Sequence, residues 1–87
     1  METFMVERSL KGITMDQLAA AQKRAIQTAS EMSAQGTPVR YLRSTFVPES
    51  GACMCLFQGD QAADIEALNQ KAGIPFTRVV PALDLSP

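Results

Sequence analysis

Residues 39–58 have the sequence VRYLRSTFVPESGACMCLFQ. Residues 39–47 are rich in β-branched and aromatic side chains, which favours a strand. Residues 48–51 have the composition of a tight turn, because Pro fixes φ at the second position and Gly permits unusual backbone angles at the exit. Residues 52–58 are almost entirely apolar, which is typical of a central strand. The stretch therefore predicts a β-hairpin in the middle of the chain.

A helix is predicted on each side of this hairpin. On the N-terminal side, Thr14 and Gln17 match the capping box, and Gly36 is the expected end. On the C-terminal side, Asp60 is the expected N-cap and Gly73 the expected residue after the helix. Apolar residues of the first helix recur at three- and four-residue steps and form one buried stripe, namely Leu18, Ala21, Ala25, Ala29 and Met32.

Short strands are predicted at both ends of the chain, over residues 3–9 and 75–81. The order β-α-β-β-α-β, with right-handed crossovers, predicts an α+β, ferredoxin-like fold. Its four-stranded antiparallel sheet has the spatial order fourth, first, third, second, with two helices on one face. Residues 1–87 are expected to form a single domain, in which residues 81–87 are a loose tail.

The composition excludes several classes of protein. A length of 87 residues, 46% hydrophobic and 20% charged, fits one globular domain. The net charge of −1 argues against partners such as nucleic acid or an anionic membrane surface. The apolar runs are too short to cross a bilayer, and acidic residues interrupt the first eight positions, so no export signal is expected. The expected location is cytoplasmic.

The strand at residues 52–58 has two apolar faces, which predicts an association surface. Met54 and Leu56 lie on one parity, and Cys53, Cys55 and Phe57 on the other. Two helices cover only one face of such a sheet, and an uncovered apolar face is typical of an interface. We therefore expect a homodimer, a dimeric α/β barrel in which two sheets stack around an enclosed lumen.

Two charged residues in the middle of strands suggest a ligand pocket in this lumen. Glu7 and Arg43 are assigned to the face away from the helices, together with Tyr41, Cys53 and Cys55. These five residues are the predicted lining of one concavity that binds a small molecule or a metal ion. The alternative is that Glu7 and Arg43 pair with each other, or reach solvent at the dimer rim.

The absence of histidine and the spacing of the cysteines limit the chemistry. Without histidine, a Ser-His-Asp triad, a Cys-His dyad and every imidazole metal site are excluded. Cys53 and Cys55 share a strand face with Cα atoms about 6.5–7 Å apart, near the limit for an unstrained disulfide. They could chelate a soft metal with two further ligands, or simply fill the core as small apolar groups. No metal ligand, cofactor or catalytic residue is assigned.

Several short motifs together carry a resemblance to a known family. They are VERS at residues 6–9, YLRS at 41–44 followed by Pro48, CLF at 55–57 and AGIPF at 72–76. In this order and spacing, over residues 4–80, the chain resembles the domain-of-unknown-function 4242 family. Its members are small bacterial domains, and its best-known branch is described as nickel-binding.

This resemblance implies a ferredoxin-like fold and a dimer. It implies nickel binding only for the branch with histidines on the sheet, and those ligands have no counterpart here. The matching positions, whose role in the family is undetermined, are Glu7, Arg8, Leu42, Arg43, Ser44 and Cys55.

Three functions remain open from the sequence. The first is a dimer that binds a small molecule or metal ion in the lumen. The second is a small cofactor-independent enzyme, such as an isomerase, cyclase or oxygenase, with Glu7 as proton shuttle. That function requires a desolvated Glu7 without a compensating salt bridge. The third is a structural or regulatory subunit, which requires a filled lumen.

Overall fold

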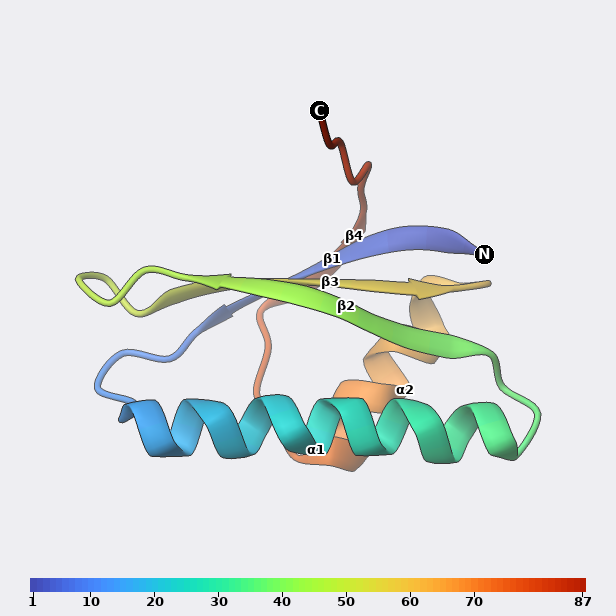
Figure 1. The fold of residues 1–87 in the computed structure, drawn as a ribbon, viewed down its shortest axis with the longest axis horizontal. Helices are drawn as coiled ribbons and strands as arrows, with labels where there is room; N and C mark the ends of the chain where they lie inside the picture. The colour runs from blue at the N-terminus through green and yellow to red at the C-terminus, as the bar shows by residue number, and fades with distance from the viewer.

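The computed structural model describes residues 1–87 as six elements. They are β1 (Glu2–Ser9), α1 (Met15–Ala34), β2 (Val39–Phe46), β3 (Ala52–Gly59), α2 (Ala62–Ala72) and β4 (Arg78–Pro81). The strands form one antiparallel sheet in the order β2-β3-β1-β4. Both helices lie on one side of this sheet, and the C-terminal tail leaves on the other (Figure 1). The predicted ferredoxin-like fold and strand order are confirmed.

Helix α1 begins and packs as its sequence predicts. The amide of Gln17 donates to the Thr14 hydroxyl over 3.1 Å, and the amide of Thr14 donates to Oε1 of Gln17 over 3.0 Å. This capping box satisfies amides that the first helical turn leaves free. The buried face of α1 consists of three alanines and one methionine, namely Ala21, Ala25, Ala29 and Met32. Neither helix is long and apolar enough to span a lipid bilayer.

The turn between β2 and β3 requires glycine at Gly51. Its φ is +79°, and a Cβ atom there would lie 2.5 Å from the backbone of Lys11. The amide of Gly51 donates to the carbonyl of Val47 over 2.8 Å, and its own carbonyl accepts from the amide of Leu10 over 2.7 Å. Gly51 therefore closes the hairpin and ties it to the loop before α1.

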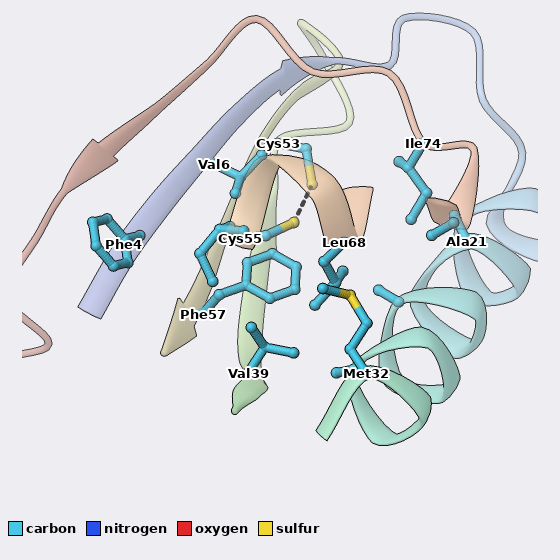
Figure 2. Close-up of a cluster of buried hydrophobic side chains, with 14 residues drawn as sticks. Phe4, Val6, Ala21, Met32, Val39, Cys53, Cys55, Phe57, Leu68 and Ile74 are labelled. Carbon is cyan, nitrogen blue, oxygen red and sulfur yellow. Dashed lines mark hydrogen bonds between the residues drawn. The ribbon is translucent and has the colours of Figure 1, made fainter. Parts of the chain in front are cut away.

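The hydrophobic core lies between the sheet and the two helices (Figure 2). The antiparallel register sets Phe4 opposite Phe57 and Val6 opposite Cys55. Residues opposite each other share a sheet face, so the side chains of Cys53, Cys55 and Phe57 point toward the helices. Together with Ile65 and Leu68 of α2, Phe57 and Val6 are among the largest side chains that are completely buried.

Two local boundaries differ from the prediction. The N-cap of α2 is Gln61 rather than Asp60, and no side chain caps this helix. The last strand begins at Arg78 rather than at Pro75, because the preceding residues cross from the helix layer to the sheet (Figure 1). Ile74 is buried in this crossing, with 6% of its surface exposed.

A β-bulge in β2 changes the direction of its side chains. Tyr41 is paired with Phe57 and Arg43 with Leu56, so Leu42 is an extra residue without a partner in β3. Because of this extra residue, Tyr41 faces the helices and Arg43 faces away from them, although they are two positions apart. The regular alternation assumed from the sequence fails at this point.

Candidate functional site

A cavity of about 170 Å³ lies between the N-terminal half of α1 and the sheet. Small side chains form much of both walls. Ala21 and Ala25 line it on the helix, and Ser44, Cys53 and Cys55 line it on the sheet. In Figure 2 the two sulfur atoms face Ala21 and Ile74 across the interior. Small residues that meet from both sides leave space where larger ones would fill it.

The structure brings together three of the five predicted pocket residues. Tyr41, Cys53 and Cys55 all line the cavity on the helix side of the sheet. Glu7 is paired with Met54 and Arg43 with Leu56, which places both on the opposite face. The prediction that all five share one concavity is therefore wrong. The thiols face the helices rather than the far side of the sheet, and the bulge at Leu42 directs Tyr41 and Arg43 to opposite faces.

Glu7 and Arg43 each have a partner that the sequence did not reveal. Nε of Arg78 donates to the carboxylate of Glu7, and Arg43 forms a salt bridge with Asp84 of the tail. The hydrogen bond from Arg78 lowers the pKa of Glu7, and the same contact raises the pKa of Arg78. Glu7 and Arg43 do not pair with each other. The enzyme hypothesis required a desolvated Glu7 without a salt bridge, and Glu7 does not meet this condition.

The sheet wall of the cavity carries a continuous chain of hydrogen bonds. Nε2 of Gln22 donates to the Tyr41 hydroxyl over 3.0 Å, and the Ser44 hydroxyl donates to Sγ of Cys55 over 3.0 Å. The oxygens of Tyr41 and Ser44 are 2.7 Å apart. Since Ser44 gives its only proton to Cys55, Tyr41 is the donor to Ser44. The sulfur atoms of Cys55 and Cys53 follow, 3.7 Å apart. The chain thus runs from an exposed mouth to the buried thiols.

Arg8 lies at the buried end of this wall, with only 5% of its surface exposed. Its Nη2 donates to Oδ1 of Asn69 over 2.9 Å, and its Nη1 donates to the carbonyl of Pro75 over 3.3 Å. Asn69 is completely buried and is itself fixed by a hydrogen bond from Nδ2 to the carbonyl of Ile65. Both salt bridges of the chain lie elsewhere. Arg8 is therefore a buried cation without a carboxylate partner.

The two cysteines form no disulfide, and the thiol of Cys53 is poorly reactive. Both cysteines are free and buried. Burial, together with the neighbouring Cys55, raises the pKa of Cys53 from 9.0 to about 11, although the charge of Arg8 acts in the opposite direction. Cys53 is accordingly a neutral thiol at physiological pH.

Comparison with known proteins places the chain in a family. Residues 4–81 match the model of the family described as nickel responsive protein SCO4226-like. The chain belongs to this family. The membership confirms that the sequence motifs indicated a small family of this kind. No curated protein matches this chain.

A solved structure shares the fold of this family member. The crystal structure of SCO4226 from Streptomyces coelicolor A3(2) matches it with a TM-score of 0.79. The sequences are 24% identical, and the match covers 98% of this chain and 99% of that chain. At 24% identity, this likeness shows that the two chains share a fold and nothing about a shared function.

Arg8 is the residue of the site that sequence reasoning missed. The sequence indicates it only as a position that matches a family motif. The alternation of β1 contained a usable signal, because Phe4, Val6 and Arg8 share one parity and therefore one face. An arginine that continues an apolar stripe is directed into the core or into a pocket. Its partner Asn69, 61 positions away, could not be identified from the sequence.

Proposed function

We propose that this protein binds a small, largely apolar molecule in the cavity between α1 and the sheet. The observation that carries this proposal is the cavity itself, about 170 Å³ in a chain of 87 residues. The cavity opens to solvent, so a small molecule can enter it. An apolar cavity of about 150 Å³ is large enough to bind benzene. The space therefore suits a molecule with one six-membered ring.

The lining has the composition of a ligand site. Leu18, Ala21 and Ala25 provide an apolar helix wall, and the hydroxyls of Tyr41 and Ser44 stand on the facing wall. Small-molecule sites typically combine a mainly apolar surface with a few fixed polar groups. The hydrogen-bond chain fixes both hydroxyls in place before any ligand arrives, which reduces the entropy cost of binding.

The family description names nickel, but the donor groups of this chain do not fit a nickel site. The chain has no histidine, and no three His, Cys, Asp or Glu side chains lie close enough together to hold a metal ion. The nearest approach is the pair of Cys53 and Cys55, which offers two sulfur atoms where a closed site commonly uses about four ligands. The proposed function therefore uses no metal.

Methyl NMR spectroscopy of the full chain tests the proposal, with benzene and toluene as probes. Saturable shifts are expected for the methyl groups of Leu18 and Ile74, which line the cavity. The methyl groups of Leu56 and Val80 lie on the opposite face of the sheet and serve as internal controls. Unchanged spectra up to the solubility limit of both probes, or shifts confined to Leu56 and Val80, would contradict the proposal.

We also propose that two copies pair through the sheet face opposite the helices. Met5 lies between Leu56 and Val80 in the register, and Met54 is adjacent on β3, so apolar groups from three strands meet on this face. No helix covers it (Figure 1). Its flanking charges include both signs, as in the pair of Glu7 with Arg78, which suits an interface that contacts its own copy. Light scattering coupled to size exclusion is expected to give the mass of a dimer.

A further inference from the structure

We propose that the ligand of this cavity is a small monocarboxylate whose carboxylate binds the guanidinium of Arg8. The inference rests on the proposed function, because it names the chemical class of the molecule for the same cavity. Its basis is the environment of Arg8, which is charged, almost completely buried and without an anionic partner.

A buried arginine normally has a counter-ion. Charged side chains are almost never fully buried unless they are paired, because removing an ion from water carries a large free-energy penalty. The acceptors of Arg8 are the neutral oxygens of Asn69 and Pro75. A guanidinium has five N–H donors. These two hydrogen bonds use two of the five donors, and the guanidinium also lies within hydrogen-bonding reach of the Cys53 sulfur, so no charged group accepts from any donor of Arg8.

The cavity contains no other charged group that could neutralise Arg8. None of its lining residues is an aspartate or a glutamate. The Cys53 thiol is close, but burial keeps it protonated, with a pKa of about 11. The carboxylates of Glu7 and Asp84 are bound to other arginines on the far face of the sheet. Arg8 is therefore the sole charged side chain in a cavity whose other lining groups are apolar or neutral polar, and it attracts an anion.

The geometry favours a carboxylate among the anions. A planar guanidinium matches a planar carboxylate with two parallel hydrogen bonds. A single positive charge balances a monoanion, whereas a phosphate dianion would keep an uncompensated charge in an apolar environment. With its carboxylate at Arg8, a ring or short aliphatic chain would lie against Leu18, Ala21 and Ala25.

Calorimetric titration with benzoate and benzyl alcohol at pH 7 tests this assignment, because the two probes differ little in size and only benzoate is charged. Wild-type protein is expected to bind benzoate roughly 10- to 100-fold more tightly, the factor expected for hydrogen bonds to a charged group. Arg8→Met should abolish this preference. Arg40→Met removes an equal charge from an exposed position outside the cavity, and should keep the preference.

A second variant tests the charge of Arg8 without removing its side chain. Asn69→Asp places a carboxylate where Oδ1 of Asn69 now accepts from Arg8 over 2.9 Å. It gives Arg8 an internal counter-ion, and should remove the preference for benzoate while benzyl alcohol still binds. This variant decides the question if Arg8→Met does not fold.

The outcomes separate this inference from the proposed function. Equal affinity of wild-type protein for benzoate and benzyl alcohol would overturn the role of Arg8 and leave the cavity as a binding site. A preference for benzoate that persists in Asn69→Asp would also overturn it. If neither these probes nor benzene and toluene bind, both the inference and the proposed function are wrong.

Discussion

Replacement of Ala21 by leucine is expected to stabilise the fold and to abolish ligand binding. Ala21 lies on the buried face of α1, with 7% of its surface exposed, and it lines the cavity. The substitution adds three carbon atoms that can extend into this space. A cavity kept for a ligand reduces stability, so filling it should separate stability from function.

The size of the effect follows from the cavity volume. A closed void lowers the free energy of unfolding by about 24 cal/mol per Å³, which gives about 4 kcal/mol for about 170 Å³. This value is an upper bound, because the cavity opens to solvent. Each buried methylene contributes about 0.8 kcal/mol, so three carbons give at most about 2.4 kcal/mol. A gain of about 2 kcal/mol should raise the Tm by about 8–16 °C in a domain of this size.

Thermal unfolding followed by circular dichroism measures this gain, and titration with benzoate measures the loss of binding. Ala19→Leu is the matched control, since Ala19 is exposed on the same helix and lines no cavity. A Tm for Ala21→Leu several degrees below that of wild type would show that no space exists beside Ala21. Stabilisation with unchanged affinity for benzoate would show that the ligand binds elsewhere.

Four further predictions concern the reactivity of Cys53, the alkaline and the acid sides of the stability profile, and the assembly. The pKa of Cys53 is raised from 9.0 to about 11, so its thiolate fraction at pH 8 is about 100-fold smaller in the folded protein than in the unfolded chain. Iodoacetamide should therefore label Cys53 at least about 100-fold more slowly in the folded protein. Comparable labelling rates with and without urea would contradict this. The same shift predicts that stability falls as pH rises from 9.0 to about 11, because the unfolded state releases this proton first. The pairing with Arg78 lowers the pKa of Glu7, which stabilises the fold at pH values above 4.5, the ordinary pKa of this carboxyl. This contribution is lost as pH falls through the lowered pKa of the folded state. In urea unfolding, the stability of Glu7→Gln should depend less on acid pH than that of wild type, and an equal dependence of stability on pH would count against the pairing. Leu56→Asp should yield a monomer by light scattering while Val47→Asp, at an exposed hairpin position, remains a dimer; two dimeric variants would argue against the proposed interface.

The elements and their order could be predicted because their signals are local. The capping box at Thr14, the alanine stripe of α1 and the Pro and Gly of the turn at residues 48–51 can each be recognised from residues a few positions apart. Right-handed crossovers then leave few arrangements for two helices and four strands, so the sheet order followed. The failure of Asp60 as a cap changed only one boundary.

The site could be predicted only in part, because its contacts are long-range. The salt-bridge partners of Glu7 and Arg43 lie 71 and 41 positions away. The bulge at Leu42 has no glycine or proline to mark it, and it invalidates face assignments along half of β2. The cavity itself exists because small residues of α1 meet small residues of β3, a coincidence that appears only once the register is known.

One residue of the cavity wall gives the molecule an optical property. The chain contains one tyrosine and no tryptophan. That tyrosine, Tyr41, stands at the mouth of the cavity, hydrogen bonded to Gln22 and Ser44, with its ring edge-on to Phe57 at 5.4 Å. Excited beyond the absorption of phenylalanine, the unlabelled protein fluoresces from this side chain alone. A non-absorbing aliphatic carboxylate that enters the cavity should therefore change the emission of the whole molecule, so the native chain is its own indicator of occupancy.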